Sequence, residues 1–311
     1  MMPHIFDVVC VGNAKIDSFL TLHEAGNLRL MKDSNELCIK FGEKITVDKM
    51  DILVGGNAAN VAVGTSRLGL NTGLVAEIGK DEFAQKIIDT LTKEKVDVSN
   101  IQQTEGQQSS FSTIINFKGE RTIFSEHVKR SHDFNFENVS AKWVYLTSLG
   151  EEWIDAYNKI VDFVKKTNCR LAFNPGTLQI SAGKKNIENV LHISDVLFVN
   201  KEEGEALLEY RPRQKSIEDI TLNLQKFGPK IVVITDGKNG SIAIDDKGNI
   251  SKKAIVETQV VEKTGAGDAY SSGFLSALIK NKSINDAMDL GTKNSASVIT
   301  KVGAQAGLLY V

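Results

Sequence analysis

One short segment, Thr264-Gly265-Ala266-Gly267-Asp268, combines residue types that could support the transfer of a phosphoryl group. It directly precedes the helical pattern of 267–280, and its two glycines allow the backbone to turn tightly. The unpaired N–H groups and the dipole of a helix's first turn can hold the oxygens of a transferring phosphoryl group. Asp268 is the nearest side chain that could take the proton of an attacking hydroxyl. The same string also fits a tight turn in which Asp268 only caps the helix, so the segment alone leaves both interpretations open.

A second segment, Gly55-Gly56-Asn57-Ala58-Ala59-Asn60, follows the apolar residues 52–54 and opens the helical pattern of 57–68. Glycines at this place let a small polyol approach the backbone, and the amide of Asn60 can donate to and accept from hydroxyl groups. The alternative is that the glycines ease helix–sheet packing and that Asn57 is an N-cap.

Strands and helices alternate along most of the chain, and they must position these two segments. Short apolar runs predict strands at 5–11, 74–78, 143–146, 170–173, 196–199 and 231–235. Helical periodicity predicts helices at 57–68, 81–93, 151–166, from 202, at 267–280 and at 284–300. Such a series indicates an α/β fold with a mostly parallel sheet that is covered on both faces.

Two stretches depart from this pattern. Short alternating pieces such as 18–22 and 111–117 are separated by polar turns, as in exposed antiparallel strands. We expect them to form a small β-lid over the larger domain, with lid segments at about 16–49 and 107–127. The sequence has no internal repeat, low-complexity tract or Pro-rich linker, so residues 1–311 are predicted to form one domain with this lid.

In their order and spacing, these motifs resemble the ribokinase (PfkB) family of carbohydrate and nucleoside kinases. The family has Gly-Ala-Gly-Asp at a helix start, followed by Gly-Phe (here Gly273-Phe274), and a Gly-Gly pair with Asn four residues beyond it (here Asn60). The resemblance covers nearly the whole chain and implies a ribokinase-like three-layer α/β/α domain with a β-lid. It also implies transfer of the γ-phosphoryl group of ATP to a hydroxymethyl group of a small ribose- or fructose-like carbohydrate. The matching residues would be Asp268 as general base and the amides of Gly265, Ala266 and Gly267 as anion hole.

The resemblance also assigns contacts to the substrate. The family's substrate-binding Asp corresponds to Asp17, where a carboxylate suits the binding of two hydroxyls; a turn-forming Asp is the alternative. Arg121 lies in a lid segment from which some relatives place an Arg near the substrate or the phosphates, although a solvated Arg is the commoner fate. The predicted substrate-binding residues are Asp17, Asn13, Gly55, Gly56, Asn57, Asn60 and Arg121.

The remaining motifs would hold the nucleotide. Asn200-Lys201-Glu202-Glu203 matches an Asn-x-x-Glu motif that positions the Mg²⁺ of Mg·ATP largely through water, with Glu203 as the acid. An Asn cap with acidic first-turn residues gives the same string. The turn at 235–240 resembles the family's nucleotide-contacting turn, with a plain hairpin as the alternative. The predicted nucleotide-binding residues are Asn200, Thr235, Gly237, Gly240, Thr264 and Gly303.

Three departures from ribokinase bear on cofactor and substrate. ATP and Mg²⁺ are the expected cofactors. Glu262 stands where the family often has an Asp that helps to hold potassium, so a monovalent cation such as K⁺ stays open as a further cofactor but is doubtful. Asn57 replaces a Lys, and Gly150 falls near a substrate-contacting Glu, which weakens the case for ribose. A nucleoside is the second candidate substrate, because the Gly12-Asn13-x-x-x-Asp17 start is similar to that of adenosine-kinase relatives. A non-catalytic sugar- or nucleotide-binding protein is the third hypothesis, and the intact anion-hole segment with Asp268 argues against it.

Composition and missing motifs exclude other classes. With a formal net charge of −2 and interspersed charges, a nucleic-acid partner is not expected. The cysteines Cys10, Cys38 and Cys169 are widely spaced and predict neither a disulfide framework nor a zinc site. The chain lacks a P-loop, and it lacks Gly-x-Gly-x-x-Gly after its first strand, which disfavours P-loop kinases and dinucleotide oxidoreductases.

The same survey bears on location and assembly. No signal peptide is visible, and no run approaches the ~20 apolar residues of a membrane span, so we expect a cytoplasmic protein without a membrane partner. A small-molecule sugar or nucleoside is the expected partner. For the assembly, the resemblance leaves two expectations, a homodimer through the lid or a monomer.

Overall fold

The computed structural model describes residues 5–22, 28–31, 36–118, 120–126, 128–212 and 214–311, so parts of the predicted lid segments (23–27, 32–35, 119 and 127) lie outside the described residues. The strands are β1 (Phe6–Val11), β2 (Lys15–Leu22), β3 (Leu28–Met31), β4 (Glu36–Ile39), β5 (Lys49–Gly55), β6 (Thr72–Gly79), β7 (Asp97–Thr104), β8 (Phe111–Phe117), β9 (Glu120–Ser125), β10 (Ala141–Leu146), β11 (Arg170–Phe173), β12 (Val196–Asn200), β13 (Ile231–Thr235), β14 (Ser241–Ile244) and β15 (Ile250–Lys253). The helices are α1 (Asn57–Arg67), α2 (Glu82–Lys93), α3 (Trp153–Thr167), α4 (Thr177–Ser181), α5 (Lys184–Ile193), α6 (Lys201–Leu207), α7 (Ile217–Gln225), α8 (Ala266–Ile279) and α9 (Ile284–Val298), with a 3₁₀ turn η1 (Gly237–Asn239).

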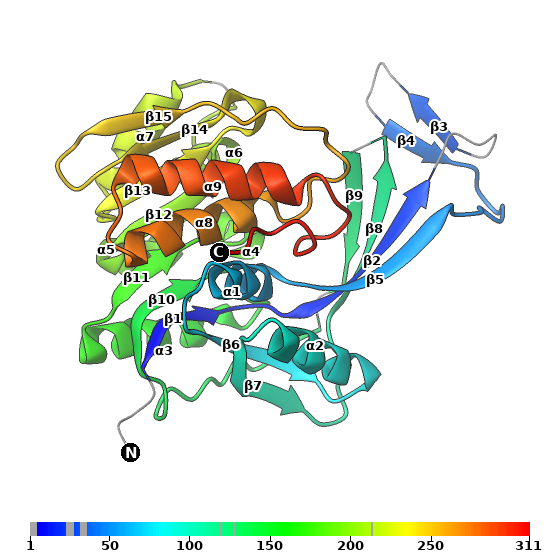
Figure 1. Ribbon diagram of the computed structural model, residues 1–311, viewed down its shortest axis with the longest axis horizontal. Coiled ribbons are helices and arrows are strands. Elements are labelled where there is room, and N and C mark those ends of the chain that lie inside the picture. The colour runs from blue at the N-terminus through cyan, green and yellow to red at the C-terminus, as the bar shows by residue number, and fades with distance from the viewer. Residues whose placement is uncertain (1–4, 23–27, 32–35, 119, 127, 213) are drawn as a thin grey trace.

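The main sheet has nine strands in the order β15-β14-β13-β12-β11-β10-β1-β6-β7. From β13 to β7 every neighbouring pair is parallel, whereas β14 and β15 are added antiparallel. Helices between successive parallel strands carry the chain back across the sheet (Figure 1). The carboxyl ends of the parallel strands therefore meet at one edge, which is where ligands bind in open α/β sheets.

Helices cover both faces of this sheet and complete three layers (Figure 1). On one face α1, α2, α8 and α9 pack against strand residues such as Val8 and Cys10. On the other face α3, α5, α6 and α7 pack against residues such as Val9 and Val11. Successive side chains of β1 thus enter opposite cores, as the two-residue repeat of a strand requires. Burial on both faces explains the continuous apolar runs that predicted these strands.

A second sheet, in the order β5-β2-β8-β9, stands beside the main domain as a lid (Figure 1). β2 pairs parallel with β8 and antiparallel with β5, and β9 pairs antiparallel with β8. Only residues 12–14 separate β1 from β2, so the lid begins at the carboxyl edge of the main sheet. β3 and β4 form a two-stranded ribbon of their own.

The expectation that the lid strands are exposed is wrong for β2 and β8 and correct for β9. Ile16 and Phe19 of β2 are buried, as is Ile114 of β8, whereas all six residues of β9 are exposed. The reason is that β2 and β8 are the central strands of the lid. Leu22 and Ile115 join a small core with partly buried residues of the β3–β4 ribbon and the segment after it.

The three-layer α/β fold, the mostly parallel sheet and the lid sheet that the sequence predicts are confirmed. The elements that the sequence patterns did not predict are β7, the β14–β15 pair, α4, α5 and α7. β7 is an edge strand with few apolar residues, and no residue of it is fully buried, so it lacks the apolar run that marks an inner strand. Among the helices of the described ranges, none is long and apolar enough to cross a bilayer.

Candidate active site

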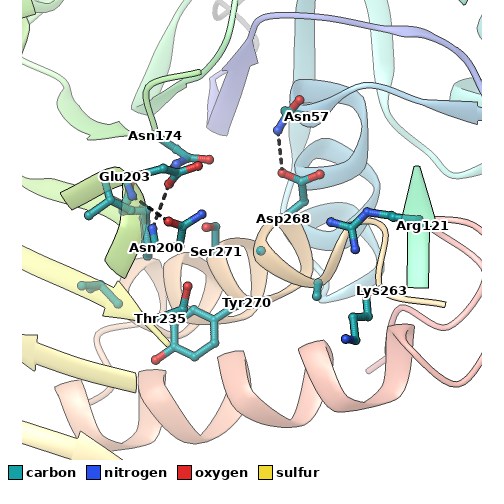
Figure 2. A pocket seen from close by; sticks show the side chains of 16 residues that line it. Asn57, Arg121, Asn174, Asn200, Glu203, Thr235, Lys263, Asp268, Tyr270 and Ser271 are labelled. Atoms are coloured by element: carbon teal, nitrogen blue, oxygen red, sulfur yellow. Dashed lines mark hydrogen bonds between the residues drawn. The ribbon is translucent and has the colours of Figure 1, made fainter. Parts of the chain in front are cut away.

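A pocket of about 250 Å³ opens where α8 begins, beside the carboxyl ends of β12 and β13 and the lid strand β9 (Figure 2). It is lined by Asn57, Arg121, Asn174, Phe198, Val199, Asn200, Glu203, Val233, Thr235, Lys263, Gly265, Ala266, Gly267, Asp268, Tyr270 and Ser271. Residues from all four predicted classes therefore share one cavity, although they come from distant parts of the sequence. Five of the predicted substrate-binding residues do not line it: Asp17, Asn13, Gly55, Gly56 and Asn60.

The first turn of α8 presents backbone amides to this pocket. Gly265 has φ 79°, and a Cβ on it would lie 2.4 Å from the Cβ of Ala304, so both conformation and space require glycine. At Gly267 an added Cβ would meet no atom within 4 Å, so open space adjoins this position. The amide of Ala266 donates to the carbonyl oxygen of Lys263 at 3.3 Å, whereas the amides of Gly265 and Gly267 have no acceptor among the described residues. Two of the three predicted anion-hole amides are thus available to an anion.

Asp268 lies in the same turn and is only 7% exposed. From α1, Asn57 Nδ2 donates to Asp268 Oδ1 at 3.3 Å and Asn60 Nδ2 donates to Oδ2 at 2.8 Å. Gln305 in turn donates to Asn60 Oδ1 at 3.1 Å. Burial raises the pKa of Asp268 to about 7, although the hydrogen bonds from Asn60 and Asn57 lower it. A carboxylate with a pKa near neutrality suits a general base.

Asp17 extends from the lid strand β2 and is 4% exposed. A Cβ on Gly55 would lie 1.9 Å from Asp17 Oδ2, so the glycine makes room for this carboxylate. Lys15 Nζ lies 3.8 Å from Asp17 Oδ1 and donates to Ser112 Oγ at 2.8 Å. Burial raises the pKa of Asp17, while Lys15 and the Ser112 hydroxyl lower it. Asp17 Oδ1 is buried without a hydrogen-bond donor among the described residues, so it is an acceptor that a ligand hydroxyl could satisfy.

Hydrogen bonds of other predicted substrate residues link the 12–14 segment to Asp268. Asn13 Nδ2 donates to Ser148 Oγ at 3.4 Å, and Ser148 Oγ donates to Asn57 Oδ1 at 3.2 Å. Gly56 has φ 97°, and a Cβ there would lie 2.4 Å from the carbonyl oxygen of Asn13, so glycine lets α1 begin against the 12–14 segment. Gly56 occupies the cap position of α1 without a side-chain capping bond, so the alternative that Asn57 is an N-cap is wrong.

Arg121 reaches from β9 toward the first turn of α8 (Figure 2). The neighbouring Lys263 pairs with Glu120, whereas Arg121 has no ion pair within the described part of the chain. A guanidinium beside free backbone amides adds positive charge and planar donors for the oxygens of a phosphoryl group. Because Arg121 belongs to the lid, its contribution depends on where the lid lies.

Asn200 and Glu203 line the pocket at the end of β12, where they form a capping box. Asn200 Oδ1 accepts from the Glu203 amide, and Glu203 Oε2 accepts from the Asn200 amide, both at 2.8 Å. The capping alternative for this motif is therefore confirmed. Burial raises the pKa of Glu203, although the Asn200 amide lowers it.

The same motif retains an oxygen for a metal ion. Glu203 Oε1 has no donor among the described residues, so capping and a contact to a hydrated Mg²⁺ are compatible. Within the described ranges no group of three or more His, Cys, Asp or Glu could hold a metal. The oxygen that the described pocket residues would offer to a hydrated Mg²⁺ is Glu203 Oε1.

Asn200 and Thr235 line the pocket, but the other four residues predicted to bind the nucleotide do not. Gly237 and Gly240 lie in the turn that joins the antiparallel strands β13 and β14. This turn has the geometry of a plain hairpin, which is the structural alternative for the motif. Gly303 has φ 92° and packs against the lid, where a Cβ would lie 2.4 Å from Leu53 Cδ1. Thr264 precedes the first turn of α8 and is held by the side chain two residues before it.

That side chain is Glu262, which is 1% exposed. Its Oε1 accepts from the amide of Thr264 at 2.7 Å and from the Thr264 hydroxyl at 2.5 Å. Its Oε2 is buried and has no donor in the described structure. Glu262 therefore keeps one buried carboxylate oxygen that a donor or a cation could satisfy.

Sequence reasoning missed several residues at this edge. Asn174 directly follows β11, donates to the carbonyl oxygen of Phe198 at 2.8 Å and lines the pocket. Ser148 follows β10 and links Asn13 to Asn57. The signal that could have found them is a polar residue just after a predicted strand, since all such positions meet at the carboxyl edge of a parallel sheet.

Comparison with known proteins decides the family. The sequence pattern of the pfkB family carbohydrate kinases matches residues 7–309. The chain belongs to the PfkB family of carbohydrate kinases. The kinase is 26% identical over 264 residues to a 5-dehydro-2-deoxygluconokinase of Clostridium botulinum, which covers 79% of this chain and 78% of the relative. It is 27% identical over 284 residues to a ribokinase of Haemophilus influenzae, covering 86% of this chain and 88% of the relative.

A solved structure shares the fold. Arabidopsis thaliana ribokinase, complexed with ribose and ATP, matches the kinase with a TM-score of 0.79 at 20% identity, over 99% of this chain and 96% of that one. The ribokinase-like fold expected from the motifs is confirmed. Membership of a kinase family implies ATP as the phosphoryl donor.

Proposed function

We propose that the kinase transfers the γ-phosphoryl group of ATP to a hydroxymethyl group of a small carbohydrate, with Asp268 as general base. The observation that carries this proposal is the first turn of α8, where a buried carboxylate with a pKa of about 7 adjoins free amides and open space at Gly267. The acceptor hydroxyl gives its proton to Asp268 while its oxygen attacks the γ-phosphorus. The bond to the β–γ bridging oxygen breaks, and ADP leaves with that electron pair.

The charge that develops on the transferring group is met by the protein. The amides of Gly265 and Gly267 and the guanidinium of Arg121 would bind the phosphoryl oxygens. The Ala266 amide would join them only by giving up its bond to Lys263. Mg²⁺ would be held near Glu203 and would neutralise phosphate charge when bound, and a monovalent cation would find its acceptor at Glu262 Oε2.

The acceptor would lie between α1 and the lid. Asp17 Oδ1 is a buried acceptor in need of a donor, and Asn57 and Asn60 present amides around Asp268. Groups of this kind recognise hydroxyls. The two relatives are named for different carbohydrates. The carbohydrate that this kinase phosphorylates must therefore be identified by a substrate screen.

The lid edge supports the proposal of a homodimer. β9 is the edge strand of the lid sheet, and its Ile123 and Phe124 are 45% and 58% exposed. Sedimentation of the wild type against a variant with Glu at both positions tests it, and identical masses would remove the proposal.

A phosphorylation screen tests the function. The purified kinase is given Mg·ATP and a panel of pentoses, hexoses, sugar acids, sugar phosphates and nucleosides, and the products are weighed by mass spectrometry. We expect one carbohydrate to gain a single phosphoryl group with an equal amount of ADP. We also expect little ATP hydrolysis without an acceptor, since a closed lid excludes water. Turnover of nucleosides alone would show that the substrate is a nucleoside and not a carbohydrate. Tight binding without any turnover would overturn the catalytic proposal.

A further inference from the structure

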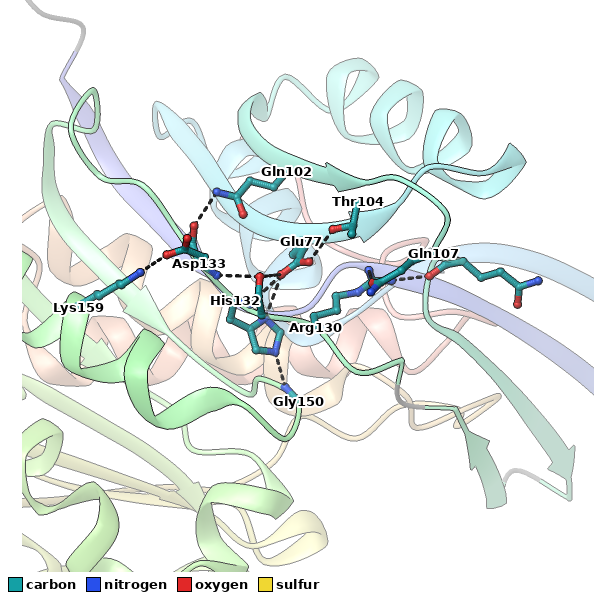
Figure 3. Close-up of polar contacts among 11 residues, drawn as sticks. Glu77, Gln102, Thr104, Gln107, Arg130, His132, Asp133, Gly150 and Lys159 are labelled. Carbon is teal, nitrogen blue, oxygen red and sulfur yellow. Dashed lines mark hydrogen bonds and ion pairs between the residues drawn. The ribbon is translucent and has the colours of Figure 1, made fainter.

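A buried polar cluster lies at the base of the lid (Figure 3). It joins β6 to the segment that enters β8 and to the segment that leaves β9. Glu77 belongs to β6 and is 7% exposed. Arg130 and His132 belong to the segment that returns from β9 and are 4% and 3% exposed. Arg130 donates to Gln107 Oε1 at 3.0 Å and to the carbonyl oxygen of Gln108 at 2.5 Å. The segment entering β8 and the segment leaving β9 are thus held to each other.

Glu77 holds the returning segment to the main sheet. Its Oε2 accepts from the main-chain amide of His132 at 2.8 Å, and its Oε1 accepts from the Thr104 hydroxyl of β7 at 2.6 Å. His132 has φ 49°, a left-handed conformation that residues other than glycine rarely adopt. Such a conformation persists where the surrounding structure over-determines it, here through the carboxylate of Glu77.

The ring of His132 leaves this cluster and contacts the loop after β10 (Figure 3). Its Nε2 lies 3.1 Å from the amide of Gly150, which donates to it. Nε2 must therefore carry no proton, and the geometry assigns the proton of the neutral ring to Nδ1. Nδ1 is buried, 3.9 Å from Glu77 Oε2, and makes no hydrogen bond with the described residues.

The loop that His132 holds carries a residue of the active site. Ser148, two residues before Gly150, donates to Asn57 Oδ1 at 3.2 Å, and Asn57 donates to Asp268 Oδ1 at 3.3 Å. Other hydrogen bonds hold the loop from the main domain and the 12–14 segment. Tyr157 donates to the carbonyl of residue 147, Gln179 donates to that of residue 149, the amide of residue 147 donates to the Val11 carbonyl, and Asn13 donates to Ser148. Among the described residues, the contact from His132 ties the loop to the chain returning from Arg121.

We propose that His132 is a positioning residue of the kinase: as a neutral acceptor it fixes the returning lid segment to the 147–150 loop, and through Ser148 and Asn57 it sets the orientation of Asp268. The inference rests on the proposed role of Asp268 and adds a residue that lines no part of the pocket. A proton on Nε2 would place two N–H donors face to face and release the loop.

The charges around the ring come from three elements. Burial lowers the pKa of His132, and Arg130 lowers it further, whereas Glu77 of β6 and Glu152 at the start of α3 raise it. Glu152 is itself paired with Lys129 at 2.7 Å. The neutral, accepting ring is therefore the form present at neutral pH, and it is lost on acidification.

The test compares His132→Gln, whose side-chain oxygen can still accept from Gly150, with His132→Leu, which cannot. His192→Leu, at an exposed site on α5, is the control for removal of an imidazole. We expect kcat to fall about tenfold or more in His132→Leu, to stay within about threefold in His132→Gln, and KM for ATP to change little in both. Melting temperatures ensure that each variant is assayed folded. Equal losses of kcat in both variants, in step with their melting temperatures, would mean a purely structural role.

The pH profile provides a readout that a structural role would not move. Burial lowers the pKa of His132 from its ordinary 6.5, so protonation of His132 should join that of Asp268 only on the acid side of this value. There log kcat should fall with a slope above one in the wild type. The slope should be one in His132→Gln, and this profile decides the matter even if the Leu variant does not fold. A wild-type slope of one would overturn the inference. Full turnover by Asp268→Asn would instead overturn the proposed function, so the two failures are distinguishable.

Discussion

Asn60 Nδ2 donates to Asp268 Oδ2 at 2.8 Å, although the two residues stand 208 positions apart in the sequence. Gln305 donates to Asn60 Oδ1 at 3.1 Å, so the amide cannot turn its oxygen toward the carboxylate without losing that bond. The donor orientation of Asn60 stabilises the ionised form of Asp268 and opposes the effect of burial on its pKa. This contact between α1 and α8 therefore lowers the pKa of the proposed catalytic base against the larger effect of burial.

Removing that donor should shift the pH dependence. Because Asp268 must be ionised to accept a proton, kcat of the wild type should rise with pH through about 7. In Asn60→Ala the pKa of Asp268 rises further, so the midpoint moves to higher pH and activity at neutrality falls. Asn57→Ala should move the midpoint less, since its bond is longer at 3.3 Å. A midpoint that is the same in all three proteins would contradict this account.

Replacing the base should abolish most of the chemistry but not the binding of nucleotide. We expect Asp268→Asn to lower kcat by about 10²-fold or more, since an amide cannot take the proton of the acceptor hydroxyl. Titration calorimetry with ATP should give a dissociation constant close to that of the wild type. Turnover at the wild-type rate would remove Asp268 from the mechanism.

The same substitution should stabilise the fold at alkaline pH. The folded pKa of Asp268, about 7, lies above its ordinary 3.8, so the stability linked to its protonation is complete below 3.8 and is lost as pH rises through about 7. At about pH 8 the buried charge costs up to about 4 kcal/mol. Asn avoids that cost but loses an acceptor for Asn60, worth about 1 kcal/mol.

Urea unfolding checks this expectation. Asp268→Asn should be more stable than the wild type by about 1–3 kcal/mol at about pH 8, and the difference should shrink toward about pH 4. A constant difference across this range would show that the charge of Asp268 is not the cause.

Substitution by Ala should affect stability differently at Gly265 and Gly267, although both glycines belong to the turn that begins α8. Gly267→Ala meets no atom within 4 Å and improves helix propensity, so the melting temperature should hold or rise, while kcat falls because the methyl occupies phosphoryl space. Gly265→Ala should lower the melting temperature, since that residue has φ 79° and no room beside Ala304. An active Gly267→Ala enzyme would show that the anion binds elsewhere.

Asp17 should govern affinity for the acceptor alone. In Asp17→Asn we expect KM for the carbohydrate to rise about tenfold or more, with KM for ATP unchanged, because a buried acceptor of hydroxyl donors has lost its charge. Asp89→Asn, at an exposed carboxylate of α2 bonded to Gln85, is the control and should behave as the wild type. A parallel rise in both KM values would instead indicate a general disturbance of the site.

Local patterns were sufficient where one segment performs a function by itself. The glycines around Ala266, the carboxylate that follows them and the helix they open are all within a few residues, so their sequence predicts an anion-binding turn. The apolar runs of β1 and β12 likewise predict buried strands, because both of their faces are covered. The capping box of Asn200 and Glu203 shows the limit, since the same string serves structure and a ligand at once.

Contacts between distant segments were out of reach. Ser148 and Asn174 are marked in the sequence only as polar residues just after predicted strands; the parallel sheet brings them to the edge where Asp268 lies. The burial of β2 depends on its place between β5 and β8, and the link from His132 to Gly150 depends on where the chain returns from the lid.

The sequence alone determined which residue types stand at each helix start and strand end, because turn geometry and periodicity are properties of neighbouring residues. The tertiary structure decided which of them meet and how strongly they titrate. The pKa of Asp268 is the clearest case: burial raises it to about 7 and the amides of Asn60 and Asn57 lower it, and both effects exist only after α1 packs against α8.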